Sequence, residues 1–199
     1  MYLCGNDQSA SAAGAGVAVA GDISLNMGTA MVFYTLIDTM QLTLKENQIF
    51  GLCPINNKYF LLSLEKEFGN IIESLKERYF SSESYNDLFS CYSKLKNEPE
   101  KFVSISIKDS KIIADESIPK ELLTASVINY FINKILDHLV QINEHCPIKK
   151  IYISGGVSQG KWLEILKQEI KYHLFISNGR QAALIGAIKI FLKNNQGER

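Results

Sequence analysis

Residues 151–162, IYISGGVSQGKW, constrain the fold more than any other segment of this 199-residue chain. The apolar residues that open the segment predict a short strand, which ends at the paired glycines Gly155 and Gly156. A helix is expected next, over residues 161–171, because apolar positions recur there at helical spacing. A strand that turns through glycine into a helix is typical of α/β proteins, so the segment favours that fold class.

The remaining sequence alternates between strand and helix patterns. Apolar strands at residues 23–27 and 31–36 flank a Gly-Thr turn and predict a hairpin, and a second hairpin is expected around residues 108–110. Helices are predicted over residues 8–19, 64–79, 85–95, 119–145 and 180–193, and short strands over residues 1–4 and 173–176. Because no linker or repeat interrupts these elements, we expect residues 1–199 to form one α/β domain with a mixed sheet.

Composition excludes several classes of function. The 21 Lys and Arg residues balance 21 Asp and Glu residues, so the basic surface of a protein that binds nucleic acid or an anionic membrane is not expected. No apolar stretch reaches the roughly 20 residues that span a bilayer, and the first residues do not resemble a secretory signal. The four cysteines lack a C-x-x-C pair, and the three histidines lack metal-ligand spacing. We therefore expect a cytoplasmic protein with reduced thiols and no metal ion held by its side chains.

The glycine-rich turn after residue 154 has three interpretations. Gly155, Gly160 and Lys161 match most of a phosphate-binding P-loop, but Trp162 stands where that loop needs a Ser or Thr hydroxyl for magnesium. Alternatively, the turn serves only to pass the chain from strand to helix. The interpretation that we favour is that glycines at the end of a strand let a flat nucleotide base or ribose lie against the backbone.

Two further segments carry polar residues at positions that suit a ligand. Asp7 stands between a predicted strand and a helix of small residues, where by default it caps the helix and stabilises it by about 1 kcal/mol. Gly28 and Thr29 form the turn between two apolar strands. Such a turn either presents backbone N–H groups and a hydroxyl to a phosphate or simply closes a hairpin. Neither segment decides the function by itself.

Together these segments follow the order seen in one protein family. The chain resembles the C-terminal domain of the FGGY carbohydrate kinases, which include xylulokinase-like and glycerol-kinase-like enzymes. The resemblance rests on residues 5–34, 57–77, 151–170 and 179–192. It implies an RNase-H-like domain of the actin-like ATPase fold, with a mixed sheet flanked by helices and the nucleotide in a cleft between two such domains. The N-terminal, sugar-binding domain is expected to be absent from this chain and supplied in cis or as a separate chain.

The resemblance also implies a role for individual residues. Asp7 is implied to be the catalytic base, because a carboxylate can accept the proton of a sugar or polyol hydroxyl as the new P–O bond forms. The other implied site residues contact ATP, from the phosphates through the nucleoside to the base: Gly28 and Thr29, then Gly69, Gly155 and Gly156, and last Gly160. Mg²⁺ is expected to accompany ATP, held by phosphate oxygens and water.

Two hypotheses for the function follow. In the first, the chain is the ATP-binding half of a carbohydrate kinase, inactive towards sugars until it meets its N-terminal domain. In the second, the same fold serves as a noncatalytic nucleotide-binding or interaction module. Neither nucleic acid nor membrane is an expected partner, and a homodimer is one expected assembly because a face normally covered by the other domain is left exposed.

Overall fold

A six-stranded mixed sheet forms the centre of the computed structural model. The structure describes residues 7–40, 42–53, 58–115, 117–156, 159–177 and 179–196. Among these residues the strand order is β3-β4-β2-β1-β7-β8. The strands are β1 (Asp22–Met27), β2 (Met31–Ile37), β3 (Gln48–Leu52), β4 (Tyr59–Glu65), β7 (Lys150–Ser154) and β8 (Leu174–Ile176). The four strands from β3 to β1 pair antiparallel, whereas β7 pairs parallel with both β1 and β8.

The central strand β2 is buried along its whole length, and its side chains alternate between two cores. Phe33 belongs to the core on one face of the sheet and Tyr34 to the core on the other. Leu25 of β1 is the partner of Phe33 in one direction and of Ile153 of β7 in the other. A strand covered on both faces needs apolar residues at nearly every position, which explains the uninterrupted sequence MVFYTLI.

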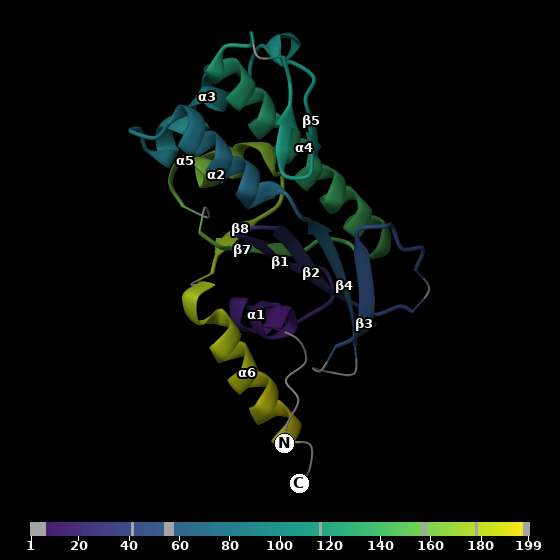
Figure 1. Cartoon of the computed structure of the whole chain (residues 1–199). Helices are drawn as coiled ribbons and strands as arrows, with labels where there is room; N and C mark the ends of the chain where they lie inside the picture. The colour runs from purple at the N-terminus through teal and green to yellow at the C-terminus, as the bar shows by residue number, and fades with distance from the viewer. Residues whose placement is uncertain are drawn as a thin grey trace.

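Four helices cover one face of the sheet (Figure 1). They are α2 (Phe68–Tyr79), α3 (Tyr85–Leu95), α4 (Lys120–His145) and α5 (Gly160–Glu169). Trp162 of α5 is fully buried, and its ring stacks on Phe68 at 5.8 Å and on Phe89 at 5.0 Å between ring centroids. These stacked aromatic side chains join α2, α3 and α5 into one body. The small hairpin of β5 (Ser106–Lys108) and β6 (Lys111–Ile113) lies outside this layer of helices.

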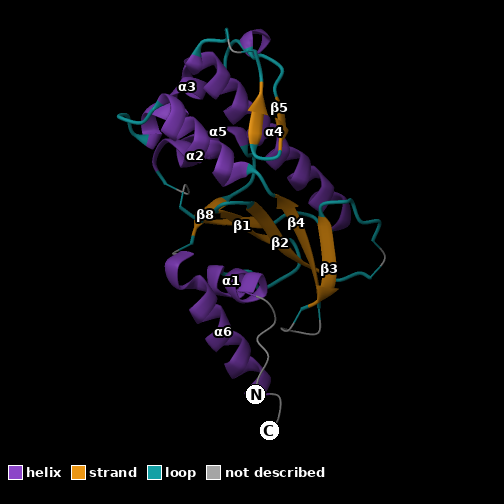
Figure 2. Cartoon of the chain, in the orientation of Figure 1, coloured by secondary structure: helices purple, strands orange, loops and turns teal. Residues whose placement is uncertain are grey.

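Two helices, α1 (Asp7–Ala15) and α6 (Gly179–Gln196), lie on the opposite face of the sheet (Figure 2). They cross at glycine residues: a Cβ at Gly14 would lie only 1.7 Å from the carbonyl oxygen of Ala182. A Cβ at Gly186 would meet the backbone of α1 at the same separation of 1.7 Å. Glycine therefore sets how closely the two backbones approach, since any side chain at these positions would push the helices apart.

The structure confirms the α/β class and the mixed sheet, and corrects some of the predicted elements. The helix predicted over residues 64–79 begins at Phe68, because residues 59–65 form β4, a strand that the sequence analysis missed together with β3. The apolar residues of β4 run directly into the helix pattern, which hides the boundary. The helix predicted over residues 8–19 ends at Ala15, where Gly16 turns the chain with a φ of 121°. The strand predicted over residues 1–4 lies outside the described residues.

None of the helices in the described ranges combines the length and the apolar character that a membrane crossing needs.

Candidate functional site

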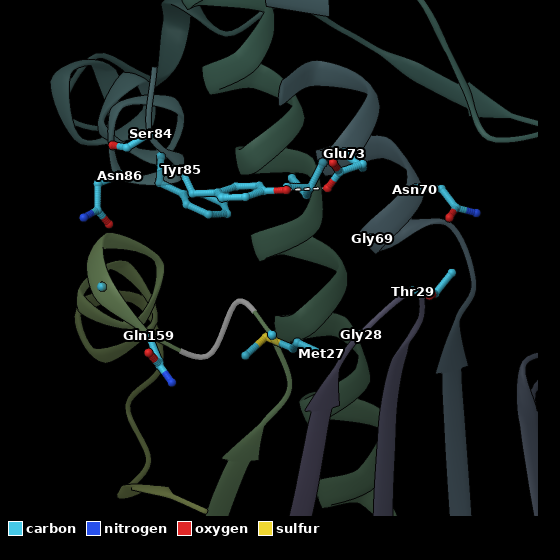
Figure 3. Close-up of a pocket in the computed structure, with 14 residues that line it drawn as sticks. Met27, Gly28, Thr29, Gly69, Asn70, Glu73, Ser84, Tyr85, Asn86 and Gln159 are labelled. Carbon is cyan, nitrogen blue, oxygen red and sulfur yellow. Dashed lines mark hydrogen bonds between the residues drawn. The ribbon is translucent and has the colours of Figure 1, made fainter. Parts of the chain in front are cut away.

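A cavity of about 720 Å³ lies where the β1–β2 turn meets the first turns of α2, α3 and α5 (Figure 3). Four separate segments of the chain line it. The lining residues are Met27, Gly28 and Thr29, then Gly69, Asn70, Ile72 and Glu73, then Ser84, Tyr85, Asn86 and Phe89, and finally Gly156, Gln159 and Gly160.

Three helices, α2, α3 and α5, begin at this cavity. The free N–H groups of a helix N-terminus and the helix dipole both favour an anion. The start of α3 is capped by its own side chains, since Ser84 and Asp87 form a capping box. The residues that precede α2 and α5, Glu67 and Gln159, make no such side-chain cap. The backbone dipoles of α2 and α5 therefore remain directed at whatever occupies the cavity.

Backbone hydrogen bonds hold the walls of the cavity in place. The Gly69 amide donates to the carbonyl oxygen of Thr29 at 2.8 Å, which ties the start of α2 to the β1–β2 turn. The Lys161 amide donates to Oδ1 of Asn86 at 2.9 Å, which ties the start of α5 to the start of α3. These two hydrogen bonds connect the four segments that line the cavity in pairs.

Three glycines of the site are required by the backbone itself. A Cβ at Gly69 would lie 2.4 Å from the carbonyl oxygen of Gly28. Gly155 has a φ of +108°, and its Cβ would lie 2.1 Å from the carbonyl oxygen of Met27. Gly160 has a φ of +60° and would meet Oδ1 of Asn86 at 2.5 Å. Packing and backbone conformation explain these glycines without any ligand.

Gly28 and Gly156 differ from these three glycines in their surroundings and backbone conformation. A Cβ at either position would meet no described atom within 4 Å, and neither residue has the positive φ that favours glycine. Both line the cavity, just beyond the ends of the neighbouring strands β1 and β7. The described part of the protein therefore gives no reason for glycine at these two positions. A ligand that lies close to the bare backbone does give one.

The charges around the cavity argue against a P-loop. Among the described residues that line it, only Glu73 is charged. Lys161, the lysine of the P-loop interpretation, does not line the cavity, and its Nζ pairs with Glu164 at 3.0 Å. Trp162 is buried, and its Nε1 lies 3.2 Å from the sulfur of Met27. A phosphate bound here would thus meet backbone dipoles and not the ammonium group that a P-loop supplies.

Tyr85 and Glu73 connect two walls of the cavity. The Tyr85 hydroxyl donates a hydrogen bond to Oε2 of Glu73, from the start of α3 to α2 (Figure 3). This bond to a carboxylate favours the protonated phenol and raises the pKa of Tyr85 to about 12. Nζ of Lys76 lies 5.7 Å from the centre of the Tyr85 ring. The ring is therefore held at both ends and contacted by a cation.

The structure brings five of the seven predicted site residues to one place: Gly28, Thr29, Gly69, Gly156 and Gly160.

The other two lie elsewhere. Gly155 sits directly behind the cavity wall, against the end of β1. Asp7 is the first residue of α1, exposed, with Oδ1 accepting a hydrogen bond from the Gln8 amide at 2.9 Å. It does not line the cavity, and α1 lies on the other face of the sheet (Figure 2).

Sequence reasoning missed the wall that α2 and α3 supply. Asn70, Glu73, Tyr85 and Asn86 all lie in the first turns of these helices. The S-x-x-D pattern that begins at Ser84 could have located the start of α3. No local pattern, however, indicates that this helix start faces the glycines of residues 155–160.

No protein-family model matches the sequence, and no curated protein matches it significantly. Solved structures do match. A xylulose kinase from Bifidobacterium adolescentis is similar with a TM-score of 0.76 at 16% identity, over 97% of this chain and 40% of that one. A gluconate kinase from Lactobacillus acidophilus is similar with a TM-score of 0.74 at 15% identity, over 96% of this chain and 42% of that one. A Plasmodium falciparum glycerol kinase, solved with ADP, is similar with a TM-score of 0.72 at 11% identity, over 94% of this chain and 41% of that one.

The chain thus spans about two fifths of the length of the kinases that it matches. At sequence identities of 11–16%, the similarity to these structures establishes a shared fold only. The order of strands, the helices on both faces of the sheet and the near-complete coverage of this chain all agree with that fold. The chain has the actin-like ATPase fold of the C-terminal domain of FGGY carbohydrate kinases, as the resemblance in its sequence implied.

Proposed function

We propose that this chain is the ATP-binding domain of a carbohydrate kinase, which transfers the γ-phosphate of ATP to a hydroxyl of a sugar or polyol. The observation that carries the proposal is the pair Gly28 and Gly156, two cavity-lining glycines that the packing of the described residues does not require. The fold adds support, because every similar structure described above is a sugar, sugar-acid or polyol kinase and one was solved with ADP.

ATP fits the chemistry of the cavity in one orientation. The nucleoside would lie against Gly156 and Gly160, and the phosphates would extend towards Gly28 and Thr29 at the β1–β2 turn. The Thr29 hydroxyl and the dipole of α2 favour the phosphate charge there. Mg²⁺ would be held by phosphate oxygens and water, since the cavity offers one carboxylate, Glu73, and no cluster of metal-ligating side chains occurs among the described residues.

Asp7 would act as the base from the other face of the sheet. Its carboxylate would accept the proton of the acceptor hydroxyl as that oxygen attacks the γ-phosphorus, and such a base contributes about 10²–10⁴-fold to the rate. Asp7 is exposed at the start of α1 and lies outside the cavity. The acceptor would therefore have to meet Asp7 and the γ-phosphate beyond the edge of the sheet, held there by an N-terminal domain.

The proposal includes the rest of the enzyme. An N-terminal domain, in cis or as a separate chain, would supply the sugar contacts, in agreement with the two fifths of the kinase length that this chain covers. The 199 residues alone would bind the nucleotide but phosphorylate no sugar. A cytoplasmic location follows from the proposal, since ATP and sugar phosphates are found there.

Calorimetry with Mg·ADP tests the nucleotide site. Gly156→Ala places a methyl group in the cavity without touching any described atom, so we expect unchanged stability and about tenfold weaker binding, equivalent to about 1.4 kcal/mol. Ser106→Ala is the control, because Ser106 is exposed in β5 and does not line the cavity. Failure of the unaltered chain to bind millimolar Mg·ADP would contradict the proposal.

The position of Asp7 outside the cavity favours a second function, a noncatalytic nucleotide-binding or interaction module. Asp7→Asn in the protein assembled with its N-terminal domain distinguishes the two. For the kinase, kcat falls by about 10²–10⁴-fold while the affinity for ADP stays the same. An assembled protein that binds ATP and phosphorylates none of a panel of ketoses, polyols and sugar acids would establish the module instead.

A further inference from the structure

Among the described residues of the cavity wall, Tyr85 is the one aromatic residue that offers its ring to a ligand. Of the two aromatic side chains that line the cavity, Phe89 is 2% exposed and packed against Trp162, whereas Tyr85 is 39% exposed. Figure 3 shows the Tyr85 ring extending from the start of α3 across the cavity towards α2, on the side opposite Met27 and Gln159. The ring thus faces the segment of the wall that carries the glycines.

Contacts at both ends fix the orientation of this ring. At its Cα end, Tyr85 is the first residue of α3, and the capping box of Ser84 and Asp87 holds that turn. At its hydroxyl end, the hydrogen bond to Glu73 anchors the ring to α2. A ring that is already oriented loses little conformational freedom when a ligand stacks on it, so most of the contact energy is retained as affinity.

The other polar groups near Tyr85 are committed to the structure. Asn86 accepts the hydrogen bond of the Lys161 amide, and Ser84 is part of the cap of α3. Glu73 accepts the Tyr85 hydroxyl through Oε2, and its second oxygen can still accept from a ligand. This end of the cavity therefore offers a flat aromatic face and bare glycine backbone, with Glu73 as the one charged residue among the described lining and Lys76 near the Tyr85 ring. A nucleobase meets those conditions, whereas a triphosphate does not.

We propose that Tyr85, oriented by Glu73, is the stacking platform for the nucleobase. This inference rests on the proposed function, because it assumes that the cavity takes a nucleotide. It assigns the base end of the cavity to the α2–α3 wall and leaves the phosphate end to the β1–β2 turn. Stacking on an aromatic side chain is worth about 5- to 150-fold in affinity, and any base can use it because every base has a π face.

Calorimetric titrations with Mg·ADP, adenosine and magnesium tripolyphosphate test the assignment. Tyr85→Leu removes the ring, so the affinities for ADP and adenosine should fall by about 5-fold or more while that for tripolyphosphate stays the same. Tyr85→Phe keeps the ring and loses only the hydrogen bond to Glu73, so its affinity for ADP should lie between those of the unaltered chain and of Tyr85→Leu. Tyr172→Leu, at a tyrosine of similar exposure outside the cavity, is the matched control and should change nothing.

A second variant covers the case in which Tyr85→Leu does not fold. Tyr85→Trp keeps an aromatic platform and adds a fluorophore to a chain whose single natural tryptophan, Trp162, is buried. Stacking predicts quenching of the new fluorescence by ADP and adenosine and no change with tripolyphosphate.

The outcomes separate the two proposals. If the unaltered chain binds neither ADP nor adenosine, the proposed function fails and the stacking role fails with it. If it binds ADP but the affinity survives the Tyr85→Leu change, or the fluorescence of the Tyr85→Trp variant does not respond to ADP, the stacking role is wrong and the nucleotide site stands. An equal loss for ADP and tripolyphosphate would show that Tyr85 only shapes the cavity.

Discussion

The two faces of the sheet are built in different ways. On the α2–α5 face, large aromatic and aliphatic side chains interlock around Trp162, and the cavity opens at the rim of that core. On the α1–α6 face, small residues let two helices cross at glycine, and α6 has its main contacts with α1. The side of α6 that faces away from α1 carries exposed apolar residues: Leu184, Ile185, Ile188, Phe191 and Leu192.

This difference indicates which part of the domain is complete. A helix that is apolar on all sides is normally buried on all sides, and within the described part of the chain α6 is covered mainly where it meets α1. The α2–α5 face contains its own core and its own ligand cavity. The α1–α6 face carries the proposed base, Asp7, together with an apolar surface of the kind that another domain covers.

The largest effect is expected at Trp162. Trp162→Ala removes the ring that joins Phe68 and Phe89, so it should reduce the free energy of unfolding by about 3–5 kcal/mol in urea denaturation. Tyr172→Ala, at an exposed aromatic residue, should cost less than about 0.5 kcal/mol. A loss of less than about 1 kcal/mol at Trp162 would mean that the α2–α5 face does not depend on this cluster.

Acid should destabilise the α2–α5 face through His138. This side chain is buried against Phe33, with Nδ1 2.7 Å from Oγ of Ser63. Burial, aided by Lys134, lowers the pKa of His138 from 6.5 to about 4. Well above the unfolded pKa of 6.5 the stabilisation by neutral His138 is fully present, because both the folded and the unfolded chain are uncharged there. As the pH falls towards 4, only the unfolded chain takes up the proton, so up to about 3 kcal/mol is lost.

Urea denaturation at a series of pH values from about 7 down to about 4 measures this loss. His138→Phe keeps the stacked ring and removes the titration, so its stability should fall less steeply between pH 6.5 and 4 than that of the unaltered chain. Equal slopes for the two proteins would assign the acid sensitivity to other groups.

On the α1–α6 face, Gly186 should not tolerate a side chain. Gly186→Ala places a Cβ 1.7 Å from the carbonyl oxygen of Ala10, so the helices must separate at a cost of about 1–3 kcal/mol. Hydrogen exchange should then become faster in α1 and α6 while the amides of β1, β2 and β7 keep their protection. Faster exchange throughout the sheet would show that the two faces unfold as one unit.

The sequence predicted those parts of the fold that local patterns encode. The β1–β2 hairpin, α3, α4 and β7 each show a clear period, a cap or a turn residue, and the structure has them close to the predicted positions. β3 and β4 were missed. The mostly apolar sequence of β4, YFLLSLE, fits a buried strand as well as a helix. Only pairing with β2 decides between the two.

The candidate site likewise contains residues that a local sequence pattern indicates and residues that only tertiary packing places there. Gly28, Thr29 and Gly156 stand out in the sequence because small residues at strand ends are a local signal, and all three line the cavity. Tyr85 and Glu73 carry no such signal, since an aromatic and an acidic residue in the first turns of helices are ordinary. What makes them part of the wall is the packing of α2 and α3 around Trp162, which depends on contacts between distant segments.

The smallest effect on stability is expected on the outer side of α6, and it tests the comparison most directly. Ile188 is 51% exposed and Ile190, two residues further on, is 1% exposed against α1. Ile188→Lys should change the free energy of unfolding by less than about 0.5 kcal/mol and reduce self-association in sedimentation at high concentration. Ile190→Lys on the same helix should cost several times more, because it buries an unpaired charge. If Ile188→Lys destabilised the monomer as much as Ile190→Lys, the outer side of α6 would already be covered within this chain, and the surface left for another domain would have to lie elsewhere.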